Sequence, residues 1–520
     1  MNKSIFKFSN ILMFILYAFV FLCIFGFLTH YTMHSALCIE DTNYIRHQFS
    51  FNRIWSFVGL YITRLLLFEI PKLLNVHVYS TLWIWRSFEY IVLIGLIFLY
   101  SRFLNTRILR FFGFLFAAVI TMYVTIYNIE FIQSSYVFNR YIVSLVCFFV
   151  FHWFYLKNML EFEGQNRKYN IIGAVMLLIL STSTEIFIIE TVVMLIIVSL
   201  VNYMTKKIKF SKDLFWGLIA TAAINLIGNK VFDEKNAAIP KDLDIEYFFR
   251  NLYSYCIYKA SDILIFLAII MVIALVIFIK NKNDYKMPLY AVSMLIANFT
   301  AAVLLIFFDW RFLFNDKIMI VFYLNYTIPL FVLISYIYKH INRKKLFTGF
   351  VVVCMIGFMA HYITVRYQRT YAHYLHMMNV NNIKRTLVYQ YEKAARYAQL
   401  TGRKPVFLYD KFLYCETNDF MIQDIHNAMK YLDVKMYNPN TVICFDTNNP
   451  DISVFNSMRV SYKHVYDSGF CLTKNKSKMI TNVSEGEKIK EDLAIVTNEE
   501  LKKTDFSKLK DDKFVLDKTF

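Results

Sequence analysis

The 520-residue chain lacks three features, and each absence argues against a class of protein. Its eight cysteines form no CxxC pair and no zinc-like spacing, so the sequence predicts neither a redox motif nor a structural metal centre. No small-residue cleavage site follows the first apolar run, so this run is expected to stay in the protein. No internal repeat is visible, although many transporter folds are built from repeats.

Acidic residues are also scarce, since 38 Asp and Glu stand against 56 Lys and Arg and leave a formal net charge of +18. Much of this excess lies in short loops between apolar runs, where it sets membrane orientation, and nucleic-acid binding is therefore not expected. Hydrophobic residues make up 58% of the chain and aromatic residues 18%. Many apolar runs approach the length of about 20 residues that crosses a bilayer, so we predict a polytopic membrane protein.

The apolar runs predict about eleven membrane crossings. The first extends from about Ile11 to Leu28 and, because Lys3 and Lys7 precede it, is expected to run outward from the cytoplasm. The other predicted spans are Leu82–Tyr100, Phe111–Tyr127, Val137–Leu156, Ile171–Ser183, Ile186–Met204, Leu214–Val231, Ile263–Ile279, Met287–Phe308, Ile318–Tyr338 and Leu346–Val365. This count places the C-terminus outside.

Every predicted inner loop is basic, which supports this topology. The residues concerned are Arg102 to Arg110, Lys157 with Arg167 and Lys168, Lys206 to Lys212, Lys280 to Lys286, and Lys339 to Lys345. The apolar stretch Ile54–Ile70 contains Arg64 and Glu69 and is followed by Pro71. Counting it as a span would place the Arg102 loop outside, so we expect it to lie along the outer membrane surface.

The segment from Ile171 to Met204 is long for one crossing and short for two. We therefore predict a helical hairpin with the sequence STSTE, Ser181 to Glu185, at its tip. Hydroxyl groups there would satisfy backbone groups left by the turn, and Glu185 would face protein or water because a carboxylate in hydrocarbon is costly.

From Arg366 onward the composition is that of a water-soluble domain. Helices are expected at Asn379–Leu400 and Asp419–Leu432, and strands at Val406–Asp410 and Thr441–Asp446. The predicted fold is thus mainly α, with transmembrane residues 1–365, an outer first loop at 30–81, and a small extracytoplasmic α/β domain at 366–520. The tail from Lys474 is expected to be partly flexible.

Charged residues gather at the predicted outer ends of the spans. They are Glu40, Asp41 and Arg46 in the first loop, Arg86 and Glu89 at the start of the second span, Glu130, Arg140 and Glu185, and Asp309, Arg311 and Lys317. Sugar transfer from a lipid-linked donor needs both carboxylates and cationic side chains. A carboxylate takes the proton of the acceptor hydroxyl, and cations neutralise the departing phosphate. Arginine suits the phosphate, since its planar fork makes two charge-assisted bonds.

The first loop, the number of spans and the outer C-terminal domain together resemble the GT-C superfamily of membrane glycosyltransferases. The likeness is greatest to bacterial serotype-converting O-antigen glucosyltransferases and related multi-pass families, and the tip STSTE and the segment from Asn381 to Asp410 resemble theirs more weakly. The resemblance implies transfer of a hexosyl or pentosyl group from a polyprenyl phosphate to a surface glycan or lipid. It also implies that the acidic pair of the first loop is catalytic, matched here by Glu40 and Asp41, although the family more often shows Asp-Asp.

Each candidate residue has a structural alternative. Asp41 could cap a helix, and Glu40 need not point where Asp41 points, because adjacent side chains diverge. Arg311 could anchor the interface beside Trp310, Arg140 could pair with Glu130, and Glu185 could bond only neighbouring hydroxyls. These alternatives stay open at the level of the sequence.

The sequence therefore predicts an inverting glycosyltransferase of the bacterial plasma membrane, with a cytoplasmic N-terminus. Asp41 would act as the base, and Arg311, Arg140, Glu185, Glu130 and Arg46 would bind substrate. Metal dependence is open, because either Mg²⁺ or Mn²⁺, or basic side chains alone, would neutralise the phosphate. The alternatives are a flippase or transporter of a lipid-linked saccharide, and a scaffold for envelope assembly.

Overall fold

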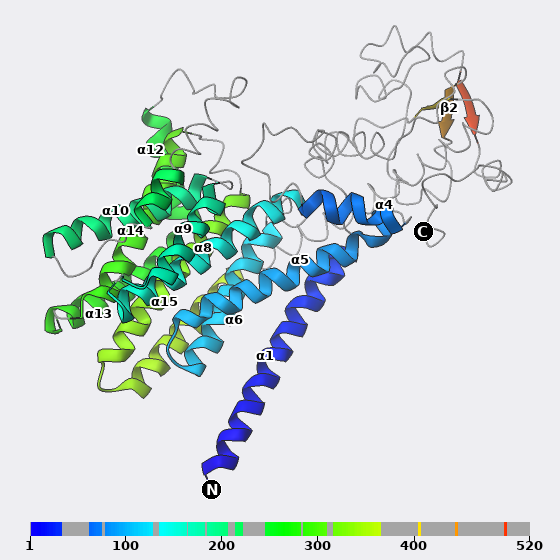
Figure 1. The fold of residues 1–520 in the computed structure, drawn as a ribbon. Helices are drawn as coiled ribbons and strands as arrows, with labels where there is room; N and C mark the ends of the chain where they lie inside the picture. Colours follow the sequence, from blue (N-terminus) through cyan, green and yellow to red (C-terminus); the bar gives the residue numbers. More distant parts are fainter. Residues whose placement is uncertain are drawn as a thin grey trace.

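The computed structural model describes most of the predicted membrane region and three short pieces of the C-terminal region. The described residues are 2–33, 62–74, 78–127, 135–163, 165–181, 185–205, 214–221, 245–281, 284–308, 316–365, 404–406, 442–445 and 493–496. Helices dominate this part of the chain (Figure 1).

The long helices follow the apolar runs of the sequence. They are α1 (Asn2–Met33), α5 (Val78–Tyr100), α6 (Arg107–Tyr127), α8 (Ser135–Glu161), α9 (Arg167–Ser181), α10 (Glu185–Thr205), α13 (Ser261–Lys280), α14 (Lys286–Phe308), α15 (Asp316–His340) and a last helix, Lys344–Val365. Shorter elements are η2 (Leu65–Glu69) and α4 (Ile70–Leu74), the 3₁₀ turn η3 (Ser101–Phe103), the helix at 214–221, α12 (Ile245–Ser254) and η4 (Tyr255–Lys259).

Seven helices in the described part of the chain are long and apolar enough to cross a membrane. They are Ile11–His30, Thr81–Phe103, Tyr141–Glu161, Ser261–Lys280, Lys286–Phe307, Met319–His340 and Lys344–Val365, and each coincides with a predicted span. The chain is thus built as a multi-pass membrane protein. α6, α9 and α10 lie over three further predicted spans, and the helix at 214–221 lies over the first part of Leu214–Val231, whose remainder is outside the described residues. The total of eleven crossings stays a prediction.

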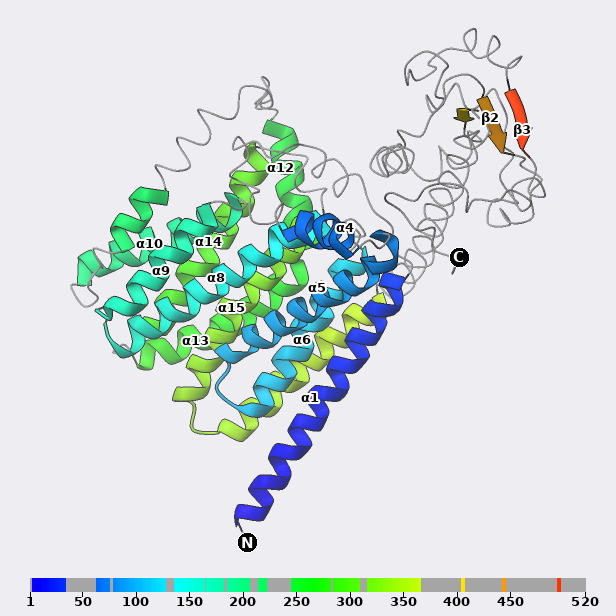
Figure 2. The same cartoon turned by 45° about the vertical axis from the view of Figure 1, so that its right-hand side comes forward.

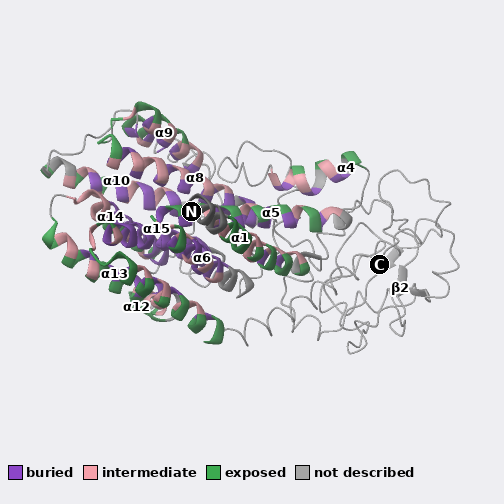
Figure 3. Ribbon diagram, turned by 90° about the horizontal axis from the view of Figure 1, so that it is seen from below, coloured by how far each residue is buried: buried purple, intermediate pink, exposed green. Residues whose placement is uncertain are grey.

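α15 forms the centre of the bundle. Every residue of α15 from Met319 to Ile337 is buried, whereas few residues of α1 and α13 are buried along their spans (Figure 3). α15 packs against α5, α6, α8, α13 and α14, and Pro329 lies within it. Because α15 is shielded on all sides, it tolerates buried polar residues such as Asn325 and Ser335, which lipid would disfavour.

Small residues allow close helix packing at two points. A Cβ atom on Gly217 would lie 2.9 Å from the Cβ of Ala174, so the helix at 214–221 approaches the α9 backbone closely. A Cβ atom on Gly113 would collide with Leu104. Such small-residue contacts are typical of membrane helices, whose association depends on packing instead of on exclusion of water.

The two helices of the predicted hairpin end at the edges of its predicted tip, and residues 182–184 between them lie outside the described residues. α9 ends at Ser181 and α10 begins at Glu185, on either side of the predicted tip. The two helices contact each other, but α9 packs more extensively against α8, and α10 against α14. The apolar part of α10, Ile186–Val201, is shorter than the seven helices that are long enough to cross a membrane.

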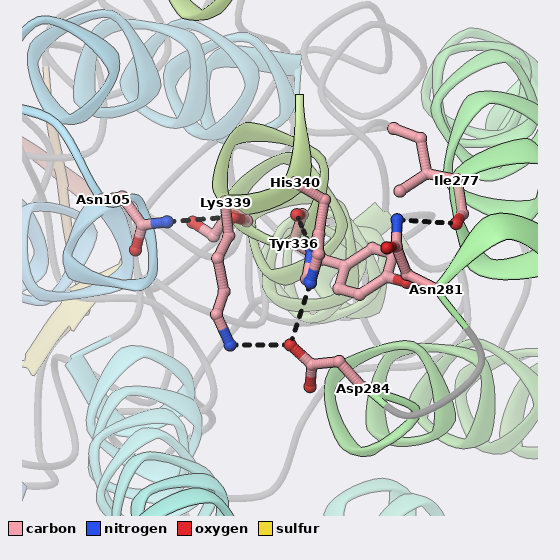
Figure 4. A network of polar contacts seen from close by, with 8 residues as sticks. Asn105, Ile277, Asn281, Asp284, Tyr336, Lys339 and His340 are labelled. Atoms are coloured by element: carbon pink, nitrogen blue, oxygen red, sulfur yellow. Dashed lines mark hydrogen bonds and ion pairs between the residues drawn. The ribbon is translucent and has the colours of Figure 1, made fainter. Parts of the chain in front are cut away.

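Four of the predicted inner loops meet at one end of the bundle, which we call the predicted inner end. Lys339 Nζ lies 2.6 Å from Asp284 Oδ2, and His340 Nε2 lies 3.2 Å from the same oxygen (Figure 4). Asn105 donates a hydrogen bond of 2.9 Å to the carbonyl of Ser335, and Lys286 lies 3.7 Å from Glu163. The opposite end, where α5 and α8 begin, is called the predicted outer end.

The helix over the predicted surface segment continues through Pro71 into α4. Pro71 has no amide hydrogen to donate, and it comes directly after the π-helical turn η2, where the Ile70 amide bonds the carbonyl of Leu65, five residues earlier. Its position relative to the bilayer stays a prediction. In the C-terminal region, β1 (Lys404–Val406), β2 (Val442–Phe445) and β3 (Leu493–Val496) form a parallel sheet in the order β1-β2-β3. β2 falls within the predicted strand Thr441–Asp446, while the α/β domain as a whole stays a prediction.

Candidate functional site

Two charged side chains are buried together near the start of α5. Arg86 and Glu89 are three residues apart, a spacing that places both on one face of a helix. Their side chains are 0% and 2% exposed, and Arg86 Nη1 lies 3.7 Å from Glu89 Oε2. Removing two charges from water costs several kcal/mol for each ion, and their attraction offsets this only where hydrogen bonds complete the arrangement.

Asn139 supplies such hydrogen bonds from α8. Its side-chain nitrogen donates to Glu89 Oε1 at 3.0 Å and to Thr63 Oγ1 at 3.1 Å, and both contacts are buried. Next to it, Phe138 packs edge-to-face on Tyr90 with ring centroids 5.9 Å apart. Residue 139 thereby joins α5, α8 and the helical turn that precedes η2. We call Thr63, Arg86, Glu89 and Asn139 the polar cluster.

The polar cluster lies where the first loop leaves and re-enters the bundle. α1 runs antiparallel along α5, and the ring of Tyr17 lies 5.4 Å from that of Phe98 near the far end of α5. The C-terminal end of α1 therefore reaches the end at which α5 begins, as Figure 2 shows. Thr63, on the other side of the loop, is itself in the cluster. The chain directly after the first loop is therefore held in the polar cluster through Thr63, and α1 ends at the same end of the bundle.

The structure leaves the predicted site residues untested. Glu40, Asp41, Arg46, Glu130 and Arg311 lie outside the described residues. Arg140 follows Asn139 in α8 and Glu185 opens α10, but only their backbone positions are described. Of the charges predicted at outer helix ends, the structure brings together Arg86 and Glu89.

A second buried carboxylate was not predicted. Glu190 in α10 is 0% exposed, and its Oε2 accepts a hydrogen bond from the side-chain nitrogen of Asn325 in α15. The signal was in the sequence IFIIETVVML, where one acidic residue interrupts an apolar run. Such a residue within a membrane span is by default a candidate functional residue. Glu190 lies within the apolar run and not at a predicted helix end, where the candidate charged residues were expected.

Further polar groups surround Glu190 within the bundle. The hydroxyls of Tyr255 and Tyr326 lie 3.0 Å apart, and Tyr326 follows Asn325 in α15. Pro329 has no amide hydrogen, so the carbonyl of Asn325, four residues earlier, lacks its helical donor. The site around Glu190 thus combines a carboxyl, an amide and a free backbone acceptor well inside the bundle.

No group of three His, Cys, Asp or Glu side chains that could hold a metal ion occurs among the residues the structure describes. The first loop is outside that set, so metal dependence stays open. Comparison with known proteins adds no assignment: no family model, no curated protein and no solved structure matches the chain.

Proposed function

We propose that the protein is a membrane glycosyltransferase that moves a sugar from a polyprenyl phosphate donor to a glycan or lipid acceptor on the outer face of a bacterial plasma membrane. The observation that supports this proposal is the polar cluster, which through Thr63 includes the chain that follows the loop bearing Glu40 and Asp41. Hydrogen-bonded buried charges hold this end of the bundle in one arrangement. A base on a loop needs a fixed frame beside it in order to meet its substrate.

In this mechanism a carboxylate oxygen of Asp41 takes the proton of the acceptor hydroxyl. The acceptor oxygen forms a bond to the anomeric carbon, while the bond from that carbon to the phosphate oxygen breaks and the electron pair leaves with the lipid phosphate. Attack from the side opposite the phosphate inverts the anomeric configuration. Glu40 would orient the acceptor or share the role of base.

Arginines are proposed to stabilise the leaving phosphate. Arg140 follows Asn139 of the polar cluster along α8 and is proposed from this position in the sequence. Arg311 and Arg46 are proposed from the outer loops, and Glu130 and Glu185 from the helix ends. A divalent cation, Mg²⁺ or Mn²⁺, would supply the same neutralisation. Arg86 and Glu89 act as positioning residues, since both are already buried in the frame.

The proposal is tested with purified protein in liposomes that contain a polyprenyl-phosphate sugar and a candidate acceptor. We expect transfer of the sugar with inverted configuration at the anomeric carbon, measured by mass spectrometry and NMR of the product. Transfer with retention would contradict the single displacement. No transfer from any polyprenyl-phosphate hexose or pentose, by protein that is folded and monodisperse, would contradict the proposal as a whole.

The orientation is tested with a native residue, because Cys38 lies two residues before Glu40. In intact cells, an impermeant thiol reagent is expected to label Cys38, and peptide mapping identifies the site. Cys38→Ser should remove this label and leave the others unchanged. Labelling of Cys38 only after permeabilisation would place the first loop on the cytoplasmic side and contradict the mechanism.

A second candidate function, a proton-coupled transporter or flippase for a lipid-linked saccharide, is favoured by Glu190. A carboxyl group inside the bundle beside a proline-interrupted helix is a recurring arrangement in such proteins. In this function Glu190 would gain and lose a proton as substrate crosses.

Glu190→Gln separates the two functions, because glutamine keeps the shape and can still accept the hydrogen bond from Asn325 but cannot exchange a proton. If the protein is a glycosyltransferase, this variant is expected to keep the sugar-transfer rate of the wild type within a factor of about two. A transporter is expected to lose pH-driven translocation, measured in proteoliposomes with a fluorescent lipid-linked saccharide. Translocation by the wild type that the variant lacks would support the second function over the first.

A further inference from the structure

Oxygen atoms that accept no hydrogen bond lie together inside the bundle, around the contact between Glu190 and Asn325. The side-chain nitrogen of Asn325 donates to Glu190 Oε2, and Glu190 Oε1 and Asn325 Oδ1 have no hydrogen-bond partner among the described residues. Each of these two oxygens is bonded to the same carbon as an atom of that hydrogen bond, so both lie beside it. The backbone carbonyl of Asn325 is a third acceptor, because Pro329 cannot donate to it. Both side chains are 0% exposed.

Asn298 of α14 lies at the same level of the bundle. Val201 near the end of α10, Leu289 near the start of α14 and Leu333 of α15 line one cavity, which fixes the register of these three helices. Asn298 is nine residues from Leu289, while the hydrogen-bonded pair is eleven residues from Val201 and eight from Leu333. The levels therefore agree within about one helical turn, and α14 packs against both α10 and α15.

The side chain of Asn298 adds a further oxygen at this level. It is 0% exposed, and neither its oxygen nor its nitrogen has a hydrogen-bond partner in the part of the chain that the structure describes. A buried amide without partners is costly, because it has lost its hydrogen bonds to water. Three helices thus bring four oxygen acceptors to one level of the bundle interior.

Glu190 has no basic partner to balance a charge. None of the ion pairs within the described ranges includes it. A carboxylate without a counter-ion inside a membrane protein costs several kcal/mol, and the hydrogen bond from Asn325 does not neutralise it. A cation held by the same oxygens would supply the balancing charge.

We propose that Glu190, Asn325 and Asn298 bind one sodium ion. The ligands would be Glu190 Oε1, the side-chain and backbone oxygens of Asn325, and the side-chain oxygen of Asn298. One carboxylate suits a monovalent cation, because a divalent cation would leave a net charge buried in the bundle. Backbone carbonyls freed where a membrane helix is interrupted are known ligands of Na⁺. The site does not include the first loop, so this proposal is independent of the sugar-transfer function.

The test measures binding of radiolabelled Na⁺ to the full chain in detergent micelles, without any saccharide and at an ionic strength kept constant with choline chloride. We expect one ion per chain, displaced by unlabelled NaCl. Glu190→Gln keeps the shape of the side chain but removes its charge, and Asn298→Leu removes both amide atoms at similar volume. Each is expected to weaken binding roughly tenfold or more, measured as the dissociation constant. Using two site variants guards against misfolding of one.

Two further variants serve as matched controls. Glu69→Gln removes a carboxylate that is 47% exposed and paired with Arg64, outside the proposed site. Thr191→Val changes the residue next to Glu190, whose hydroxyl already donates to the carbonyl of Phe187 at 2.7 Å. Both should bind Na⁺ as the wild type does. Absence of Na⁺ binding by folded wild-type protein, or unchanged binding in Glu190→Gln or Asn298→Leu, would overturn the proposal.

Discussion

Asp41→Asn is expected to abolish sugar transfer, with a fall of about 10²–10⁴-fold in rate if only the general base is lost. Asparagine has nearly the same shape as aspartate, but its amide cannot take the proton of the acceptor hydroxyl. The loss should appear in the rate at saturating donor, with little change in donor affinity, because the phosphate is assigned to the arginines. Initial rates in liposomes at varied donor and acceptor measure both quantities.

Two further substitutions make this result specific. Glu40→Gln reports whether the neighbouring carboxylate takes part in the reaction. A partial loss of transfer rate in this variant would mean that the carboxylates of both Glu40 and Asp41 contribute. Asp262→Asn, at the first turn of α13 and outside the proposed site, should keep the transfer rate. Size-exclusion profiles establish that each variant is folded. Full activity of Asp41→Asn would remove this residue from the mechanism.

Arg86→Met is expected to lower the free energy of unfolding by about 3–5 kcal/mol. Methionine roughly fills the space of the arginine stem, but it leaves the carboxylate of Glu89, which is 2% exposed, without the cation 3.7 Å away. The hydrogen bond from Asn139 does not neutralise that charge. Denaturant unfolding in detergent micelles, followed by tryptophan fluorescence, measures the change.

The chain contains a matched control for this substitution. Arg64 and Glu69 are 3.0 Å apart but are 37% and 47% exposed, so Arg64→Met should cost less than about 1 kcal/mol. The double variant Arg86→Met with Glu89→Met should recover much of the lost stability, because it buries no unpaired charge. Equal effects of Arg86→Met and Arg64→Met would mean that the buried pair does not hold this end of the bundle together.

The helical architecture was largely predictable because crossing a bilayer imposes a length and an apolar composition that a sequence shows directly. The seven helices long enough to span coincide with predicted spans. The loops around Asn105, Glu163, Asp284 and His340 meet at one end of the helix bundle. Their shared basic character had indicated that they lie on the same side of the membrane.

The contacts within the candidate site were less predictable. Arg86 and Glu89 stood out as charged residues beside an apolar run. Their partner Asn139, however, is 50 residues from Glu89 and 76 residues from Thr63 along the chain. No local pattern encodes such a contact, because packing between helices decides it. Glu190 has a local signal, one acidic residue within an apolar run, but its partner Asn325 is 135 residues away along the chain. Asp41 and Glu40 lie outside the described residues, so their role rests on the resemblance and on the loop they share.

The burial of α15 from Met319 to Ile337 has a consequence for biogenesis. During synthesis this helix enters the membrane before its last neighbour, Lys344–Val365, has emerged, and Tyr323 would then lack its hydroxyl contact with Tyr362 of that helix. We expect α15 to leave the translocon together with the helices that enclose it, and chains truncated directly after His340 to be removed by membrane proteases.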